Sequence, residues 1–290
     1  MPGWRVLDLT AFEGSLGIRS NVIYVGDDRI AAIDDCSGIL LGPRCRITTS
    51  ALVRLSEAGV GVCLQDHVGR GYATVVGTPD HDRVAARHRA QAELAGPKAK
   101  QAWQVIIKGK IRNQADNLEG HPRQRLRELA DGVRSGDAGN SEGHAARIYW
   151  DALFKDPHWS RRPRGGDARN SALDYGYGIV RNHMIASTFA AGLWPTLGVH
   201  HRHRSNRACL VDDLMEPFRP AVDRLVRDDI DEHLVSEGLD AEAKKALVRV
   251  LETELPDGEL MRAAIEAWAQ QFGAWLDDSS RPLKPPPRVV

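Results

Sequence analysis

Three separated segments in the middle of this 290-residue chain carry side chains that could assemble one chemical site. They are residues 140–150, 197–206 and 212–220. Each combines carboxylates or imidazoles with arginines. Carboxylate oxygens and imidazole nitrogens bind divalent cations, whereas guanidinium groups bind phosphate. Together the segments predict a metal-assisted site that acts on a nucleic-acid phosphate.

The first segment contributes Glu142, which is predicted to lie in the first turn of a helix capped by Asn140 or Ser141. Its face of the helix continues through Ala145 and Tyr149, which are small or apolar. Burying a carboxylate without a partner is costly, so this face predicts a cation or metal opposite Glu142. The alternative is an exposed acid that stabilises the positive end of the helix dipole.

The second segment is a loop that follows an apolar helix and contains three histidines. A lone histidine at such a place usually bonds to the backbone. Here, neighbouring arginines turn the loop into a local cationic patch. A zinc site that includes Cys209 is an alternative, although the paired short spacings of a structural zinc site are missing. The residues of the patch are His200, His201, His203, Arg202, Arg204 and Arg207.

The third segment is acidic. Asp212 and Glu216 are four residues apart, so they lie together on a helix, where they repel each other unless a cation lies between them. Pro217 removes a helical hydrogen bond directly after Glu216 and can fix the direction of that side chain. An ordinary acidic first turn also explains Asp212 and Asp213, but it explains Glu216 less well.

A loop between these segments combines proline and glycine with several arginines. Guanidinium groups in such a loop can follow a phosphate backbone, although a basic loop is more often only a solvated surface. A second, weaker basic stripe of Lys108, Lys110 and Arg112 lies on a preceding helix, in which Trp103 is expected to be a core residue. The residues predicted to contact DNA are Arg161, Arg162, Arg164, Arg169, Arg202 and Arg204.

Composition limits the kind of protein further. Lysine plus arginine and aspartate plus glutamate are both 39, so an anionic partner must be attracted by local patches and not by net charge. The four cysteines form no CxxC pair, as expected of reduced thiols. No signal peptide and no run of roughly 20 apolar residues is present. We therefore expect a soluble, cytoplasmic protein with no membrane partner.

The residues that position these segments predict an α+β fold. Residues 1–78 read as a small N-terminal β-rich domain, with one helix at 48–58 among short strands. Residues 79–83 have the composition of a linker. Apolar positions then recur three and four apart, which predicts a larger all-helical catalytic domain over residues 84–280. Residues 281–290 contain four prolines and are predicted to be an extended tail, disordered unless it docks a partner.

Several of these runs resemble motifs of the CRISPR-associated Cas1 integrase family in its type II form. The runs are residues 141–149, 172–177 and 213–220, with 3–5 and 110–114 fitting the same family. The resemblance implies a metal-dependent DNA endonuclease and integrase that inserts new spacer DNA into a CRISPR array during antiviral defence. It also implies that Glu142, His201 and Glu216 are the catalytic residues and the ligands of Mg²⁺ or Mn²⁺.

The same resemblance selects His201 over His200, because the family's histidine stands at that distance before the Met-Glu-Pro-Phe-Arg-Pro motif. Asp212 or Asp213 would orient the metal ligands by bonding to them, without binding the metal directly. The 3′-hydroxyl of a short DNA duplex would attack a phosphodiester at the edge of the array. The implied partners are double-stranded DNA, a second copy of the chain, the small Cas2 adaptation protein and the RNA-guided effector nuclease.

Two other hypotheses use the same residues. In the first, the chain is a non-catalytic DNA-binding scaffold, whose acids are structural and whose arginines only grip the duplex. In the second, it is a metal-dependent nuclease that acts on branched DNA and needs no array. The sequence leaves both open, because the side chains at the site would be the same.

Overall fold

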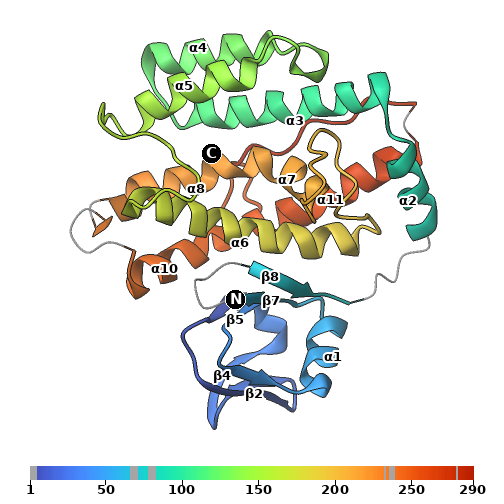
Figure 1. Cartoon of the computed structure of the whole chain (residues 1–290), viewed down its shortest axis with the longest axis vertical. Coiled ribbons are helices and arrows are strands. Elements are labelled where there is room, and N and C mark those ends of the chain that lie inside the picture. The colour runs from blue at the N-terminus through green and yellow to red at the C-terminus, as the bar shows by residue number, and fades with distance from the viewer. Residues whose placement is uncertain (1–4, 66–70, 78–82, 232, 235–238, 279) are drawn as a thin grey trace.

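A computed structural model describes the whole chain except residues 1–4, 66–70, 78–82, 232, 235–238 and 279. It has the predicted α+β architecture, with a β-rich N-terminal region followed by an all-helical region (Figure 1). The predicted linker at 79–83 lies outside the described residues except for Arg83, and so do Gly3 and Trp4 of the family motif.

The β-rich region contains two four-stranded sheets and one helix. The first sheet has the order β1-β5-β7-β8 and is parallel except for the antiparallel pair β7 and β8. The second has the order β4-β3-β2-β6 and is antiparallel except for the parallel pair β2 and β6. The strands are β1 Arg5–Leu9, β2 Gly14–Arg19, β3 Val22–Val25, β4 Asp28–Ala32, β5 Cys36–Leu41, β6 Cys45–Ile47, β7 Gly61–Gln65 and β8 Gly71–Val75.

Helix α1 (Thr49–Glu57) contacts β2 of one sheet and β7 of the other. It begins where the Thr48 side chain accepts a hydrogen bond from the backbone N–H of Ala51 at 3.2 Å. It ends before Gly59, whose φ of +73° suits glycine. Leu55 is fully buried, so the apolar face of the helix closes the core of this region.

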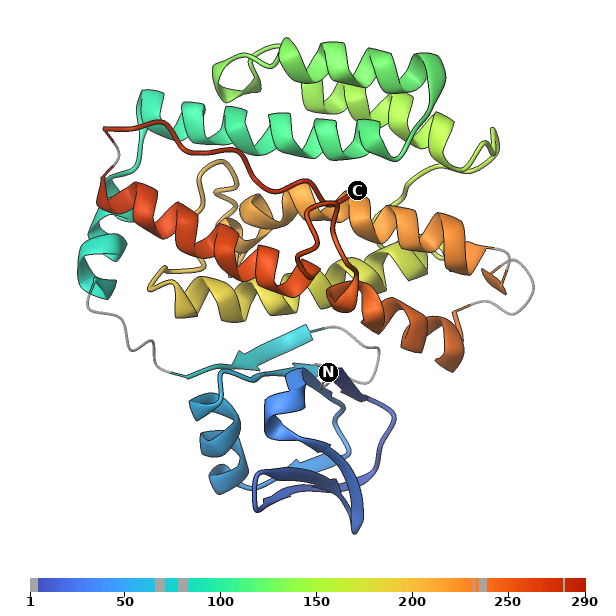
Figure 2. The same ribbon diagram turned by 180° about the vertical axis from the view of Figure 1, so that it is seen from behind.

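The helical region is built around α3 and α6, with further helices above, between and behind them (Figures 1 and 2). Its core includes the fully buried side chains of Ile106, Phe218 and Phe272. Among the described residues, no helix is both long enough and apolar enough to cross a membrane. The helices are α2 Val84–Glu93, α3 Gly96–Asp116, α4 Gly120–Asp131, α5 Ser141–Leu153, α6 Ala168–Ala190, α7 Cys209–Met215, α8 Arg219–Leu225, α10 Ala241–Val248 and α11 Met261–Asp277. Short 3₁₀ turns are η1 Ile33–Asp35, η2 Ser135–Asp137, η3 Glu216–Phe218 and η5 Arg249–Glu252, and η4 Val226–Ile230 is a π-helical segment after α8.

Helix α6 joins the two regions, because the first sheet packs directly against it. A Cβ atom at Gly61 of β7 would lie 3.3 Å from Cβ of Ala186, so a residue without a side chain favours this close approach. Thr74 of β8 donates a hydrogen bond to the Asn182 side chain at 3.3 Å. The sheet therefore supports the helix that runs under the candidate site.

Residues 281–290 are extended, as expected, but they are packed and not free. Leu283, Val289 and Val290 are buried in the same core as the helices. The expectation of a disordered segment is wrong for these residues because burying those apolar side chains offsets the entropy lost on ordering.

Candidate active site

Glu142 and Glu216 come together around one buried lysine, Lys110 of α3. The Lys110 Nζ atom lies 2.6 Å from Glu142 Oε1 and 2.6 Å from Glu216 Oε2. The two carboxylate oxygens are therefore no further apart than twice 2.6 Å. Two acids this close need a cation between them, and Lys110 supplies it here.

Local structure at the start of α5 holds Glu142 in place. Asn140 has a left-handed φ of 51°, and its side chain makes no capping bond. Instead, the Asp137 carboxylate accepts hydrogen bonds from the backbone N–H of Ser141 at 2.8 Å and of Glu142 at 3.0 Å. The cap predicted from Asn140 or Ser141 thus comes from Asp137, an acid at the positive end of the helix.

Glu216 is buried in the turn η3 between α7 and α8. Pro217 cannot continue the hydrogen bonds of α7, and the chain makes a tight turn there, as predicted. Arg219 Nε donates to Glu216 Oε1 at 2.9 Å. The other oxygen, Glu216 Oε2, lies 2.6 Å from the Lys110 Nζ atom and is paired with its positive charge.

The charge state of Glu216 follows from its neighbours. Burial alone would raise the pKa of this carboxyl, but the positive charges of Arg219 and Lys110 outweigh burial and lower the pKa to about 2. Glu216 is therefore an ionised carboxylate whose two oxygens face Arg219 and Lys110.

His201 is oriented by Asp213 of α7. The His201 Nδ1 atom lies 2.6 Å from Asp213 Oδ1. The fully buried Asp213 carboxylate also accepts from the backbone N–H groups of Val199 at 2.6 Å, His200 at 2.9 Å and His201 at 3.2 Å. Nδ1 carries the hydrogen in this arrangement, which leaves Nε2 of His201 as the atom able to bind a ligand.

The pKa of His201 responds to the acids around it. The hydrogen bond to Asp213 raises the pKa of His201, against the effect of burial, and the negative charge of Glu216 adds to the rise. Of the three residues that the family resemblance implied as one site, Glu142 and Glu216 meet directly at Lys110, whereas His201 is held by Asp213 and senses the charge of Glu216.

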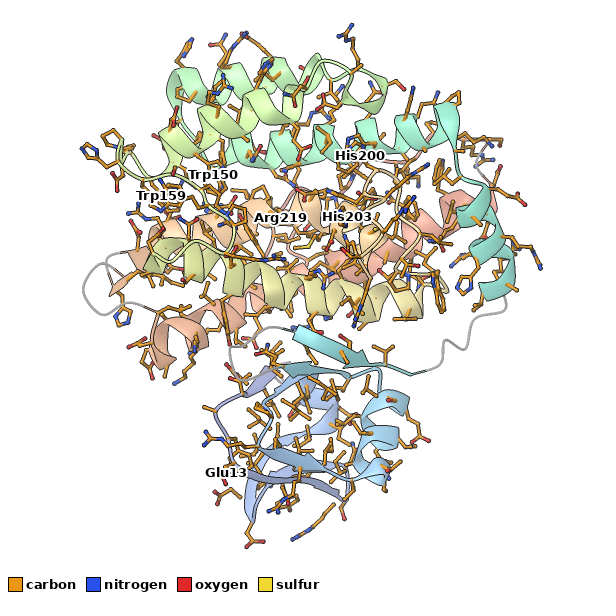
Figure 3. The ribbon with its side chains drawn as sticks, viewed as in Figure 1. Glu13, Trp150, Trp159, His200, His203 and Arg219 are labelled. Carbon is orange, nitrogen blue, oxygen red and sulfur yellow. The ribbon has the colours of Figure 1, made fainter. Side chains whose placement is uncertain are left out.

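His200 lies outside this cluster. Its exposed ring stacks on Trp103 of α3, with centroids 4.2 Å apart and planes inclined by 6°. Trp103 is buried, as predicted, and its ring also meets His201 edge-on at 5.8 Å. In Figure 3, His200, His203 and Arg219 lie in the band between α3 and α6. This arrangement favours His201 over His200 as the ligand.

The zinc alternative finds no support around Cys209. Its Sγ atom donates to the backbone carbonyl of Asn206 at 3.6 Å, and burial raises the pKa of the thiol. Across the described part of the chain, no three His, Cys, Asp or Glu side chains are already arranged closely enough to hold a metal ion. At the candidate site, Lys110 lies between Glu142 and Glu216.

The donors around Lys110 nevertheless fit a hard divalent cation. Two carboxylates and one imidazole form a mixed oxygen and nitrogen set that suits Mg²⁺ or Mn²⁺ better than a soft metal. Glu216 is ionised, and its Oε2 atom already faces a cation, the Lys110 ammonium, as an oxygen that binds a metal ion must. A divalent cation would have to displace the Lys110 ammonium.

Asp212 is bonded to residues outside the Lys110 cluster. Its carboxylate accepts from Arg181 Nε at 2.7 Å and from the Asn206 side chain at 2.7 Å. Arg181 of α6 therefore supplies a positive charge to Asp212, and Arg219 supplies one to Glu216. Of the two acids predicted to orient a ligand, Asp213 contacts one.

The predicted DNA-binding arginines fall into two groups. Arg161 and Arg169 are largely buried and paired with acids, Arg161 with Asp174, and Arg169 with Asp231 at 2.6 Å. These internal ion pairs favour a structural role for both. The exposed members are Arg162, Arg164, Arg202 and Arg204.

Two residues of the site were missed by reasoning from the sequence. Lys110 was placed only in a basic stripe, and Arg219 was given no role. Arg219 lies three residues after Glu216, a spacing that brings two side chains to one side of a helical turn. Its guanidinium group also lies 4.7 Å from the centroid of the Tyr177 ring, which holds it against the core.

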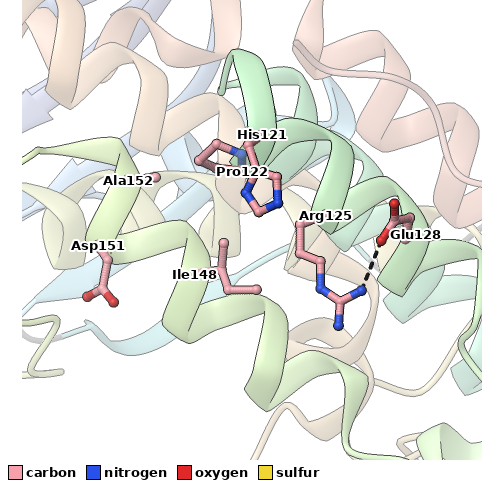
Figure 4. Close-up of a pocket in the computed structure, with 7 residues that line it drawn as sticks. All are labelled: His121, Pro122, Arg125, Glu128, Ile148, Asp151 and Ala152. Carbon is pink, nitrogen blue, oxygen red and sulfur yellow. Dashed lines mark hydrogen bonds and ion pairs between the residues drawn. The ribbon is translucent and has the colours of Figure 1, made fainter.

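A surface pocket of about 670 Å³ lies elsewhere, between α4 and α5 (Figure 4). None of the predicted site residues lines it, so this cavity does not mark the chemistry described above. Its lining residues are His121, Pro122, Arg125, Glu128, Ile148, Asp151 and Ala152.

The match to a family model decides the identity of the chain. Residues 9–251 match the model of the family described as CRISPR associated protein Cas1. The chain belongs to the Cas1 family. The CRISPR-associated endonuclease Cas1 of Neisseria meningitidis serogroup C (strain 8013) is 30% identical over 300 residues, covering 98% of this chain and 96% of that protein. The Cas1 endonuclease of Hyperthermus butylicus is 30% identical over 243 residues, covering 71% and 72%.

Solved structures share this fold with TM-scores above 0.7. A chain of a Cas6-RT-Cas1–Cas2 complex gives 0.76 at 19% identity, covering 100% of this chain and 37% of that one. A Cas1 protein from Thermotoga maritima gives 0.75 at 18% identity, covering 94% and 97%. A casposase bound to integration product gives 0.73 at 17% identity, covering 99% and 96%. At these identities the likeness establishes the fold alone.

Proposed function

We propose that this Cas1 chain is a DNA endonuclease and integrase that inserts new spacer DNA into a CRISPR array. The observation that carries the proposal is that Glu142 and Glu216 meet at Lys110, with Arg219 paired to Glu216 and with the charge of Glu216 raising the pKa of His201. The Neisseria relative, which is similar over its whole length, is named an endonuclease. That match also supports the type II form of the family, which we propose for this chain.

Glu142, His201 and Glu216 are proposed to hold Mg²⁺ or Mn²⁺. When bound, such an ion supplies positive charge that stabilises the phosphate undergoing substitution and activates its oxygens. Two side chains of the protein orient the residues that would bind this ion. Asp213 keeps the hydrogen of His201 on Nδ1, and Arg219 keeps Glu216 ionised and directed into the site.

The proposed reaction is a transesterification. The 3′-hydroxyl oxygen of the incoming duplex forms a new bond to phosphorus at the edge of the array, and the bond to the original 3′ oxygen breaks. One phosphodiester is lost and one is gained, so no energy-rich cofactor is consumed. The Lys110 ammonium, once displaced from between the acids, is free to pair with a phosphate oxygen. Water in place of the DNA hydroxyl gives a simple cut.

The proposed assembly is a homodimer joined by the small Cas2 protein, with the RNA-guided effector nuclease taking part. The structural likeness to a chain of a complex that contains Cas2 supports this proposal. We also propose that the protein works in the cytoplasm and that its two regions divide at residues 79–83. The arginines proposed to contact the phosphates of double-stranded DNA are Arg162, Arg164, Arg202 and Arg204, which are exposed.

A joining assay tests the proposal. Purified protein, its small partner, a supercoiled plasmid with a CRISPR array and a labelled short duplex with 3′-hydroxyls are mixed with Mg²⁺ or Mn²⁺. We expect the label to join the plasmid, and the product to be lost with EDTA or in Glu216→Ala. Glu128→Ala, which removes an acid from α4, serves as the control and should join normally.

Two other outcomes would each support one of the alternative functions. Tight DNA binding without joining or cutting in any metal would refute the enzyme and leave the scaffold. Cleavage of forked DNA in the absence of an array, with no joining, would favour the nuclease of branched DNA.

A further inference from the structure

Residues 281–290, called the strap below, run beside α3 as extended chain (Figure 2). Several bonds fix them although they belong to no helix or sheet. Trp275 Nε1 donates to the carbonyl of Arg281 at 3.0 Å, and Gln271 donates to the carbonyl of Lys284 at 3.1 Å. Arg288 pairs with Asp116 of α3. The strap is therefore anchored along its length and covers one side of α3.

The strap approaches α3 so closely at Gly109 that a side chain has no room there. A Cβ atom at Gly109 would lie 2.2 Å from Cγ of Pro286 and 3.0 Å from its Cδ. Glycine inside a helix lowers the stability of that helix relative to alanine. The contact with the buried Pro286 gives a physical reason for glycine at this position, next to Lys110.

Asn113 ties the strap to the turn that holds Glu216. Its Nδ2 atom donates to the carbonyl of Pro217 at 2.8 Å and to the carbonyl of Pro287 at 3.1 Å. Its Oδ1 atom accepts from the backbone N–H of Val289 at 3.4 Å. Asn113 is 1% exposed, so no water competes for these bonds. The side-chain amide of Asn113 thus uses one N–H group to bind the turn that holds Glu216 and the other to bind the strap.

We propose that the strap is a positioning element of the active site. By fixing Asn113 it fixes the carbonyl of Pro217, and with it the direction of Glu216 relative to Glu142. This inference rests on the function proposed above, in which these two acids bind the ion. The strap touches neither of the two carboxylates, so it acts through Asn113.

The test compares two exchanges of glycine for alanine inside helices. Gly109→Ala places a methyl group where Pro286 packs and pushes the strap away from α3. Gly178→Ala on α6 has no atom within 4 Å of the new Cβ and is the matched control. Asn113→Ala leaves the contact between Gly109 and Pro286 unaltered and removes the hydrogen bonds through which Asn113 connects Pro217 to Pro287 and Val289.

Two quantities are measured on each folded variant: the Mn²⁺ dissociation constant, from the electron paramagnetic resonance signal of free Mn²⁺, and kcat and KM for joining. Loss of a group that orients a metal ligand typically weakens metal binding by about 10- to 100-fold. We expect Gly109→Ala and Asn113→Ala to weaken Mn²⁺ binding by about tenfold or more and to lower kcat. KM for DNA should stay unchanged, and Gly178→Ala should match the wild type.

Unchanged Mn²⁺ affinity in Asn113→Ala would overturn the proposal even if Gly109→Ala failed to fold. Equal weakening in Gly178→Ala would also overturn it, since the loss would then not depend on the strap. If the wild type bound Mn²⁺ but joined no DNA, the proposed function would fail. The difference in metal affinity between the variants would still decide the role of the strap.

Discussion

Replacing Lys110 with methionine tests whether this lysine and a divalent cation compete for one place. Methionine keeps a flexible, apolar chain but removes the charge that Glu142 and Glu216 share. Arg219 remains paired with Glu216. We expect Lys110→Met to be less stable than the wild type without metal and to bind Mn²⁺ more tightly.

The magnitude follows from the burial of the three groups. The side chains of Lys110 and Glu216 are 12% and 7% exposed, and breaking a buried ion pair costs about 3–5 kcal/mol. Glu142 is 32% exposed and Glu216 keeps Arg219, so we expect roughly half of that, about 2 kcal/mol. In Lys110→Met, a bound Mn²⁺ ion replaces the missing positive charge and so recovers the stability lost with the lysine. Mn²⁺ affinity should therefore rise by about 10- to 30-fold, since 1.4 kcal/mol corresponds to a factor of about ten.

Calorimetric unfolding with and without Mn²⁺, together with titration of free Mn²⁺ by electron paramagnetic resonance, measures both effects. Lys108→Met is the matched control, because Lys108 lies on the same helix and pairs at 3.9 Å with the exposed Asp131. Weaker Mn²⁺ binding in Lys110→Met than in the wild type would refute the reasoning. The lysine would then be organising the acids for the ion and not occupying its place.

Three further outcomes are expected. His201→Ala should abolish joining and weaken Mn²⁺ binding, whereas His200→Ala should keep Mn²⁺ affinity within about threefold of the wild type; equal losses in both would contradict the choice of ligand. Asp213→Asn should weaken Mn²⁺ binding by about tenfold, measured by the same titration, because the tautomer of His201 is no longer fixed. Burial raises the pKa of Asp223 to about 6, against the hydrogen bonds from Tyr177 and Tyr149, so the folded state holds a proton that the unfolded state releases near pH 4. This contribution to stability is complete below about pH 4 and is lost as pH rises through about 6, a fall of roughly 3 kcal/mol in urea unfolding that Asp223→Asn should not show.

Much of the fold could be predicted because local patterns determine it. The helix expected at 48–58 is α1 at Thr49–Glu57, where Thr48 and Gly59 provide the start and stop. The pattern of apolar residues changes from short strand-like runs to positions three and four apart, and this change predicted the boundary between the two regions. The ordered packing of residues 281–290 could not be predicted, because their composition does not reveal that Pro286 packs against a glycine of α3.

The candidate site was predictable only in the residues that carry recognisable chemistry. Glu142 and Glu216 were singled out because of their places in the predicted helices, and the choice of His201 came from the resemblance to the Cas1 family. Lys110 was not, because its direction depends on how α3 packs against η3. The partner of Asp212 was not predictable either, because Arg181 comes from another helix. The packing of helices that are distant in sequence decides which charged side chains pair. The local sequence pattern carries no information about that packing.

The central claim is that this site joins a DNA 3′-hydroxyl to a phosphodiester, and the 3′ end of the incoming duplex tests it most directly. Two labelled duplexes, identical except for 3′-hydroxyl or 3′-dideoxy ends, are incubated with the protein, its small partner, an array plasmid and Mn²⁺. We predict joined label only from the 3′-hydroxyl duplex, and none from either in Glu142→Gln. Plasmid nicked equally with both duplexes, with no joined label from either, would contradict the claim.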